Sequence, residues 1–358
     1  MKISDLELCL VEIPCGGEPA LVRSLLVRVA ADSGLYGWGE TALEDRAGST
    51  ASVWRPGVAA VWRDLLLPML SGRSVFEVEE LLRLDVLQDR GLAAAVEMAC
   101  WDLIGKSARQ PLCHLSGGGY RRRIPLAARL ALRGPRETAD LAREMADRGF
   151  YSQVITASGQ LDDDLQTARA VSEATAGRAD VQFDGRSLFA FSAAGELCGE
   201  LERLGIAAVL DPLRGDDLEQ LSILRRRANV RLGVSNAIRS PADVLAVVRS
   251  GAATLISVDP RRVGGMLGTR KCAAVAEAAK LGMSLTCAPS LGVALAAMLH
   301  LASAIPNLDA AHHTAYHDLR DDVLIEPHEI VDGMLPIPSA PGLGIDVSRQ
   351  KLDQYQIG

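Results

Sequence analysis

The segment DVQFDGRSLFAFSAAGELCGELERLGIAAVLDPL (180–213) contains two short apolar runs separated by a stretch of helical character. The runs are DVQFD (180–184), in which Val181 and Phe183 stand between polar residues, and AAVLD (207–211), which is continuously apolar up to its last residue. Continuously apolar runs are typical of strands that are buried on both faces, as in parallel sheets covered by helices. The segment is therefore predicted to form a strand–helix–strand unit with parallel strands.

The same unit recurs through the rest of the chain after residue 123. Apolar runs return roughly every 23–29 residues, and each is followed by an Ala/Leu/Arg/Glu-rich stretch of helical period. The runs predicted as strands are IPLAARL (124–130), SQVIT (152–156), DVQFD (180–184), AAVLD (207–211), RLGVS (231–235), TLISVD (254–259), MSLTC (283–287) and LDAAH (308–312). Eight such units predict an α/β fold with a TIM-like barrel over residues 124–327.

The first 123 residues do not share this repeat. Two expected strands, LELCLVEI (6–13) and SLLVRVAAD (24–32), precede GLYGWGE (34–40) and helical material that ends at GKSARQPLCHL (105–115). This order predicts an α+β unit before the barrel. The tail VDGMLPIPSAPGLGIDV (331–347) is too rich in Gly and Pro for a helix, and we expect it to return to the first unit.

Composition and charge narrow the class of protein. The net charge is −7 and no basic run exceeds three arginines, which argues against a nucleic-acid partner. No stretch approaches the roughly 18 uninterrupted apolar residues of a membrane span, and the amino terminus lacks the pattern of a secretory signal. The seven scattered cysteines never form the C-x2-C spacing of a zinc site. We therefore expect a cytoplasmic protein that acts on small molecules.

Polar residues end several of the predicted strands. Asp184, Asp211 and Asp259 stand in the sequences FDG, LDP and VDP. Because the carboxyl ends of the strands form the active-site mouth of such a barrel, these carboxylates are expected to meet at one pocket. A simpler interpretation is that Asp before Gly or Pro forms a turn or caps the next helix. That interpretation suits one such residue better than three.

Four motifs follow one another along the chain: GLYGWGE (34–40), VEMACWDLIGK (96–106), VGG (263–265) and PGLGID (341–346). In this order they resemble the mandelate racemase/muconate lactonising enzyme family of the enolase superfamily. The resemblance implies a (β/α)7β barrel over 124–327 and an N-terminal α+β capping domain over 1–123, completed by 328–358. It also implies that loops near 15–20 and 46–55 cover the pocket, and that the protein forms a homo-oligomer.

Members of that family remove a proton next to a carboxylate, and a divalent metal stabilises the resulting enediolate. The resemblance places the three metal ligands at Asp184, Asp211 and Asn236. Asp211 is shorter than the family's glutamate, and the amide of Asn236 replaces an acid. The implied cofactor is therefore Mg²⁺, which prefers hard oxygen donors, in a site weaker than the family's own.

The family's proton-transfer positions hold different residues in this chain. The two lysines of its second strand map to Val154 and Thr156, neither of which titrates near pH 7. Asp259 occupies the sixth-strand position, but its histidine partner would stand near Ala288 and is missing. At the eighth strand the resemblance points to His312, and a histidine of ordinary pKa can move a proton at neutral pH. Asp259 and His312 are therefore the catalytic candidates.

A solvated loop over HHTAYH (312–317) is the alternative for that histidine. The residues expected to bind substrate are Thr156, Arg186 and Arg262. Arg186, Arg261 and Arg262 are the candidates to replace the charge of the metal if the pocket holds none. Arg186 is the best placed because it directly follows the DG turn, and we expect its guanidinium to neutralise the buried pair of Asp184 and Asp211.

Two interpretations of function remain. In the first, the protein is an isomerase or lyase that acts on a small carboxylate substrate by racemisation, epimerisation, dehydration or cycloisomerisation. In the second, it is a non-catalytic relative that keeps the fold and at most a ligand pocket. A nucleotide-binding protein is disfavoured, since neither G-x-G-x-x-G nor G-x4-G-K-[ST] follows any predicted strand.

Overall fold

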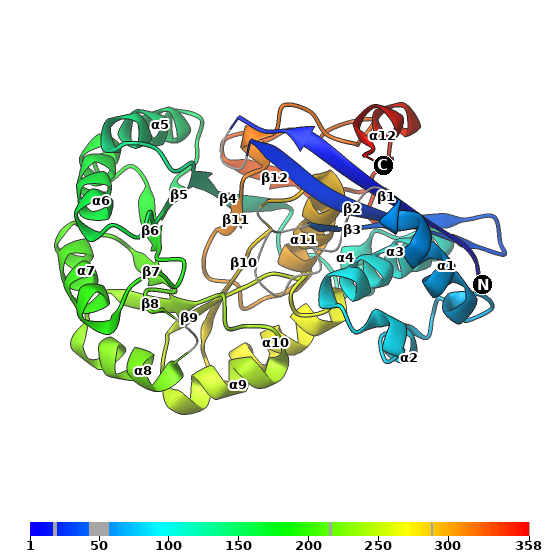
Figure 1. The fold of residues 1–358 in the computed structure, drawn as a ribbon, viewed down its shortest axis with the longest axis horizontal. Helices are drawn as coiled ribbons and strands as arrows, with labels where there is room; N and C mark the ends of the chain where they lie inside the picture. Colours follow the sequence, from blue (N-terminus) through cyan, green and yellow to red (C-terminus); the bar gives the residue numbers. More distant parts are fainter. Residues whose placement is uncertain (17–19, 43–56, 215–216, 288, 358) are drawn as a thin grey trace.

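The computed structural model describes residues 1–16, 20–42, 57–214, 217–287 and 289–357. A three-stranded antiparallel sheet with its helices lies beside a parallel barrel (Figure 1). Both chain termini lie on the side of the smaller sheet (Figure 1). None of the described helices is long and apolar enough to cross a membrane. The loop expected near 46–55, and the centre of the loop near 15–20, fall outside the described residues.

The amino-terminal sheet has the order β1-β2-β3. Its strands are β1 (Ile3–Pro14), β2 (Leu21–Ala31) and β3 (Tyr36–Ala42), and its helices are α1 (Val58–Leu70), α2 (Val78–Leu81), α3 (Arg90–Ala108) and α4 (Leu112–Leu115), with a 3-10 turn η2 (Asp85–Leu87). Helix α3 packs directly on β3 because Gly37 and Gly39 have no side chains. A Cβ at Gly39 would stand 1.8 Å from the carbonyl oxygen of Ala95. The glycines of GLYGWGE therefore set the spacing between this sheet and α3.

The barrel strands follow one another around the sheet in chain order. They are β4 (Arg123–Leu130), β5 (Ser152–Thr156), β6 (Asp180–Asp184), β7 (Ala208–Leu210), β8 (Arg231–Val234), β9 (Leu255–Val258), β10 (Gly282–Leu285) and β11 (His312–Thr314). Neighbouring strands from β4 to β10 pair in parallel, and β11 pairs in parallel with β4. A parallel bridge between Thr286 and His313 links β10 to β11. The predicted TIM-like barrel with an N-terminal α+β capping domain is confirmed.

The helices that alternate with these strands are α5 (Pro135–Asp147), α6 (Leu161–Thr175), α7 (Phe191–Arg203), α8 (Leu218–Arg227), α9 (Pro241–Ser250), α10 (Met266–Ala278) and α11 (Gly292–Ala304). Helices α5 to α9 form the side of the barrel away from the capping domain, and α10 and α11 lie toward it (Figure 1). Helix α11 is buried along its whole length, because its sequence is apolar on every face.

The eighth strand begins four residues later than predicted. The run LDAAH (308–312) was expected to be this strand, but β11 covers only His312–Thr314. Leu308 makes a single bridge to Met283, and the Asp309 carboxylate accepts the N–H of Met283 at 3.0 Å. Most of the apolar run is therefore a connection, and the strand itself is polar and too short to give a periodic signal.

A buried glutamate of the capping domain holds the start of α11. Glu40, in β3, is fully buried and accepts the backbone N–H groups of Leu291 at 2.7 Å and Ala294 at 2.8 Å. The Ser24 hydroxyl donates to the same carboxylate at 3.0 Å. The first turn of a helix has N–H groups without intrahelical partners and a partial positive charge, so a carboxylate suits it.

Glu97 of α3 does the same for α10. Its carboxylate accepts the backbone N–H groups of Met266 at 2.8 Å and Leu267 at 2.9 Å, and the indole N–H of Trp101 at 2.9 Å. Burial raises the pKa of Glu97 to about 7, although its three donors act in the opposite direction. Two of the sequence motifs thus join the capping domain to the barrel.

The carboxyl-terminal tail contacts both parts of the molecule. Strand β12 (Met334–Pro336) pairs antiparallel with β4, and α12 (Arg349–Tyr355) packs near β1. Between them the N–H of Leu343 donates to the buried carboxylate of Asp102 in α3 at 2.8 Å. Gly342, with φ of 74°, packs against the same aspartate, where a Cβ would stand 2.1 Å from its oxygen. The PGLGID motif is therefore a packing motif.

We predict that Glu97→Ala lowers the free energy of unfolding by about 2–4 kcal/mol, because one buried and two half-buried donors lose their shared acceptor. Urea unfolding followed by circular dichroism measures the change. The matched control is Glu79→Ala, which removes an ion pair to Lys271 of the same helix α10, with both side chains 54% exposed. We expect the control to change stability by less than about 1 kcal/mol. Equal losses in the two variants would contradict this role of Glu97.

Candidate functional site: a pocket lined by arginines and aspartates

A pocket opens where the barrel strands end. Its ionisable residues are Arg129, Asp184, Arg186, Asp211, Asp259, Arg262 and His313, and Val154, Leu210, Ser235, Asn236 and Thr286 complete the lining. Successive side chains of a strand point to opposite faces, so every second residue near a strand end faces this space. Asp184 at the end of β6, and Asp211 and Asp259 directly after β7 and β9, thus line one pocket together with guanidinium groups.

Asp184, the last residue of β6, lies beside Arg129 rather than beside the side chain of Arg186. One oxygen of Asp184 accepts the backbone N–H of Arg186 at 2.9 Å, and the other lies 3.6 Å from Nη2 of Arg129. Nε of Arg129 donates to the hydroxyl of Thr156 at 3.2 Å. Thr156 therefore orients Arg129. Arg129 was not among the site residues expected from the sequence, although it is a charged residue inside the apolar run IPLAARL.

Asp211 follows β7 and is buried, with 7% of its surface exposed. Its two oxygens accept the backbone N–H groups of Ser235 at 2.9 Å and Asn236 at 3.0 Å. Burial, and then the negative charge of Asp184, raise the pKa of Asp211 to about 7, against the opposing effect of these donors and of Arg262. A pKa in this range divides the carboxyl group between its protonated and ionised forms at neutral pH, where an ordinary aspartate is fully ionised.

The backbone at the pocket mouth is held in an unusual conformation. Arg186, Ser187 and Asp211 have φ values of 53°, 59° and 43°, in the left-handed region that disfavours residues with a Cβ. The N–H of Ser187 donates to the carbonyl of Asp211 at 2.8 Å, which ties the two turns together. A Cβ at Gly185 would stand 2.8 Å from that carbonyl. The glycine of the DG turn is therefore required for this close approach.

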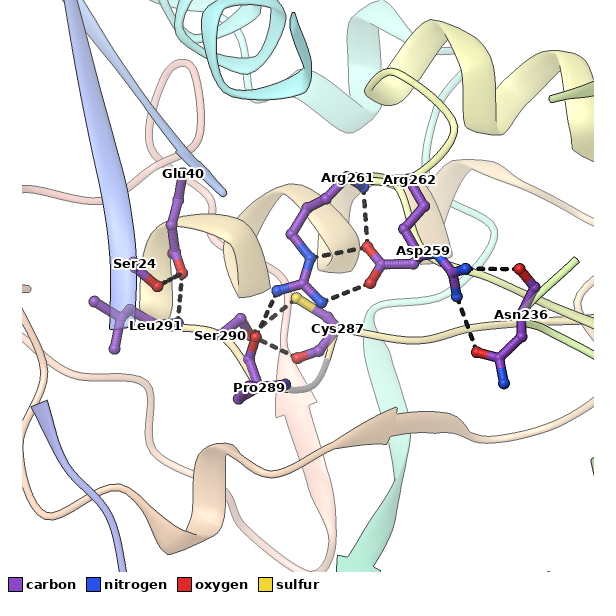
Figure 2. Close-up of polar contacts among 10 residues, drawn as sticks. All are labelled: Ser24, Glu40, Asn236, Asp259, Arg261, Arg262, Cys287, Pro289, Ser290 and Leu291. Carbon is purple, nitrogen blue, oxygen red and sulfur yellow. Dashed lines mark hydrogen bonds and ion pairs between the residues drawn. The ribbon is translucent and has the colours of Figure 1, made fainter. Parts of the chain in front are cut away.

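Arg262 donates two hydrogen bonds to Asn236 (Figure 2). Nη1 donates to the amide oxygen of Asn236 at 3.1 Å, and Nη2 donates to its backbone carbonyl at 2.6 Å. The amide nitrogen of Asn236 donates in turn to the hydroxyl of Ser187 at 3.1 Å. The side chain at the third ligand position is thus fixed with its oxygen toward a guanidinium.

The expectation for Arg186 was wrong. Its side chain is exposed and reaches the carbonyl of Ala157 at 3.4 Å, instead of neutralising the pair of aspartates. Arg129 beside Asp184 and Arg262 beside Asp211 carry the opposing charges. The physical reason is the left-handed backbone at Arg186, which turns the side chain toward the rim of the pocket.

Asp259 is held by a buried ion pair with Arg261 (Figure 2). The side chains are 6% and 4% exposed, Nε donates to one carboxylate oxygen at 2.9 Å, and Nη2 donates to the other at 2.6 Å. Nη1 of Arg261 also donates to the carbonyl of Pro289. Both oxygens of Asp259 face a permanent cation, so the expectation that it moves the proton does not fit this geometry.

His312 was the expected histidine, but His313 is the one that lines the pocket. His312 is 1% exposed, its Nδ1 accepts the N–H of Leu285 at 3.1 Å, and burial lowers its pKa to about 3. His313 pairs through Nε2 with the amide oxygen of Gln182 at 3.2 Å. Adjacent residues of a strand face opposite ways, and the pocket-facing position lies one residue later than predicted. The imidazole of His313 therefore faces the pocket, and that of His312 faces away from it.

The candidate metal ligands do not fit Mg²⁺ well. Among the described residues, no three His, Cys, Asp or Glu side chains come together in a group that could hold a metal ion. Asp184 and Asp211 supply two carboxylates, but the oxygen of Asn236 already accepts a hydrogen bond from Arg262. Mg²⁺ favours several hard, anionic oxygens in a near-ideal octahedron, whereas this set offers two carboxylates beside two guanidinium groups.

A capped parallel barrel with an ionisable pocket at its strand ends defines the structural class, and comparison with known proteins identifies the family. Residues 20–117 match the model of the mandelate racemase/muconate lactonizing enzyme N-terminal domain, and residues 137–351 match that of the enolase C-terminal domain-like family. The chain belongs to the mandelate racemase/muconate lactonizing enzyme family of the enolase superfamily.

Relatives with known activities are isomerases and dehydratases. Muconate cycloisomerase 1 of Rhodococcus opacus is 27% identical over 90% of this chain and 88% of its own length. N-succinyl-L-Arg/Lys racemase of Bacillus cereus is 22% identical over 100% of this chain and 98% of its own. A crystal structure of an isomerase from Streptomyces coelicolor superposes with a TM-score of 0.85, at 29% identity over 99% of this chain and 98% of the other.

We predict that Arg261→Met destabilises the protein by about 3–5 kcal/mol, because it leaves the buried carboxylate of Asp259 without its cation. The double variant Asp259→Leu/Arg261→Met removes both charges, and we expect it to recover most of that loss. Thermal and urea unfolding of the three variants, including Asp259→Leu alone, completes a double-mutant cycle. Losses that simply add would show that the pair is not coupled.

Proposed function

We propose that this protein is an enzyme that binds a small carboxylate in the pocket at the strand ends and moves a proton on the carbon next to it. The observation that carries the proposal is the convergence of Arg129, Arg186 and Arg262 on a pocket that also holds Asp211. Guanidinium groups recognise carboxylates through paired, charge-assisted hydrogen bonds. Activities of this kind are those of the curated relatives.

The charge balance of the pocket favours an anionic ligand. Arg261 offsets Asp259, which leaves the guanidinium groups of Arg129 and Arg262 beside the carboxylates of Asp184 and Asp211, with that of Arg186 at the rim of the pocket. Asp211 is partly protonated at neutral pH, since its pKa is raised to about 7. The lining therefore keeps an excess of at least one positive charge, which a single substrate carboxylate would balance.

Asp211 is the proposed proton-transfer group. A catalytic acid or base works best when its pKa lies near the operating pH, and burial beside Asp184 brings Asp211 to that range. Its two oxygens are fixed by backbone N–H groups, so the carboxyl group has one orientation. His313 lines the same pocket from β11, with Nε2 turned to Gln182, and supplies a second group close to the ligand.

The experiment is proton exchange in D2O followed by ¹H NMR. The substrates tested are acids named for relatives that carry a hydrogen on a saturated carbon next to the carboxylate: N-succinyl-L-arginine, arabinonate and gluconate. We expect wild-type protein to exchange the proton next to the carboxylate in at least one of them, and Asp211→Asn to lose the exchange by roughly 100-fold or more. The matched control is Asp180→Asn, an exposed residue at the opposite end of β6.

Two results would contradict this proposal in different ways. Binding of these acids by calorimetry without exchange would favour the non-catalytic relative, which retains a ligand pocket and no turnover. Absence of both binding and exchange across the panel would remove the carboxylate-binding function itself.

The pH dependence of the reaction provides a separate prediction. Proton removal requires the ionised form of Asp211, and its pKa is raised to about 7. We therefore expect kcat/KM to be constant above that pH and to fall by about tenfold per unit below it. A profile that stays flat down to pH 5, near the ordinary range of carboxyl groups, would exclude Asp211 as the base.

A further inference from the structure

The three positions that the family resemblance assigns to metal ligands already have fixed partners within this chain. Asp184 accepts the Arg186 N–H, and its second oxygen lies beside the Arg129 guanidinium. Asp211 gives both of its oxygens to backbone N–H groups. The amide oxygen of Asn236 accepts from Arg262. Every carboxylate or amide oxygen of the set therefore has a donor or a cation from the protein itself.

Arg262 is the most consequential of these partners. Its guanidinium bonds to both oxygens of Asn236, and its positive charge also acts on Asp211. It therefore acts on the second and third ligand positions together. Figure 2 shows this side chain extending from the turn after β9 toward Asn236, next to the Asp259–Arg261 pair. A divalent cation between the same positions would meet a like charge that cannot lose its proton.

We infer that this site functions without a divalent metal ion, and that the guanidinium groups of Arg129 and Arg262 supply the positive charge that stabilises the substrate carboxylate. This inference rests on the proposed carboxylate-binding function and adds the nature of its cationic centre. Its basis is the mismatch between the donor set and a hard divalent cation.

The two consecutive arginines after Asp259 have separate tasks in this arrangement. Arg261 is buried and donates hydrogen bonds to Asp259 and to the Pro289 carbonyl. These bonds fix the turn after β9. Arg262 is less buried and lines the pocket. Because Arg261 is locked, the backbone that carries Arg262 is held in place, and the guanidinium of Arg262 is oriented before a ligand arrives. Oriented charge of this kind needs no reorganisation when negative charge develops on the substrate.

Arg129 contributes from the other side of the same pocket. It belongs to β4, which is separated from β9 by the four strands β5 to β8 in one direction around the barrel and by β10 and β11 in the other. Its Nε is tied to the Thr156 hydroxyl, and Nη2 approaches Asp184. A carboxylate between Arg129 and Arg262 would therefore receive donors from two directions.

The first experiment uses wild-type protein treated with EDTA and then titrated with Mn²⁺ alone, followed by electron paramagnetic resonance and calorimetry. We expect no stoichiometric binding up to about 10 mM Mn²⁺, roughly tenfold above the weakest functional divalent-cation sites. We also expect Mn²⁺ and Mg²⁺ to leave the unfolding temperature unchanged, because an ion that binds only the folded state would raise that temperature. Stoichiometric binding at or below about 1 mM would overturn the inference.

A variant pair tests whether Arg262 is what replaces the metal. Asn236→Asp/Arg262→Ala restores a third carboxylate and removes the guanidinium, and we expect it to bind Mn²⁺ at least tenfold more tightly than wild-type protein does. Asn236→Asp alone is the matched control, and it should not gain this binding while Arg262 remains. Circular dichroism establishes that both variants are folded. A folded double variant without gain, or an equal gain in the control, would contradict the role given to Arg262.

The two proposals fail in distinguishable ways. If the substrate panel is bound or exchanged only when Mg²⁺ is added back after EDTA, carboxylate binding stands and the metal-free site is wrong. If exchange persists in EDTA and falls at least tenfold in Arg262→Ala, the metal-free site is supported. The control is Arg122→Ala, an exposed arginine that precedes β4 at the opposite end of the barrel. If no acid binds under any condition, the proposed function fails, and Mn²⁺ titration still decides the question of the metal.

Discussion

The Arg261–Asp259 ion pair connects the pocket to the capping domain. Arg261 holds Asp259 at the end of β9 and also donates to the carbonyl of Pro289. Two residues further on, the N–H of Leu291 donates to Glu40 of the capping sheet. Figure 2 shows three groups of contacts between Asn236 and Ser24, which the chain itself joins into one path at residues 261–262 and 289–291. A charge pair this deeply buried is stable only when every partner is present, so the path constrains both the pocket and the position of the capping domain.

Buried carboxylates recur wherever parts of this molecule meet, and each has fixed donors. Glu40 and Glu97 bind the first turns of barrel helices, and Asp102 binds the carboxyl-terminal tail. Removing an ion from water is unfavourable unless hydrogen bonds replace its hydration. Backbone N–H groups at helix starts provide that replacement without competing for side chains. These acidic residues of the capping domain thus determine how it sits on the barrel.

The buried aspartates of the pocket also need hydrogen bonds in place of their lost hydration, but these bonds leave the two groups with different properties. Asp211 has two backbone donors, yet burial and the neighbouring charge of Asp184 still raise its pKa to about 7. Asp259 has a guanidinium hydrogen-bonded to both of its oxygens. Two aspartates at equivalent places, each following a barrel strand, therefore have different properties because of what packs against them. At the third ligand position the amide of Asn236 stands in place of an acid, and Arg262 holds its oxygen.

The sequence by itself determined the repeating strand–helix units, the order of the two domains along the chain and the polar strand ends. These features follow from the length and periodicity of the apolar runs, which are local properties of the sequence. It could also locate Asp184, Asp211 and Arg262 at the pocket. Tertiary structure alone decided which charges pair. Arg129 rather than Arg186 faces Asp184, and Arg261 takes Asp259, because a left-handed turn and the closure of the barrel set these directions. The choice between His312 and His313 likewise depended on strand register, since a shift of one residue reverses the face.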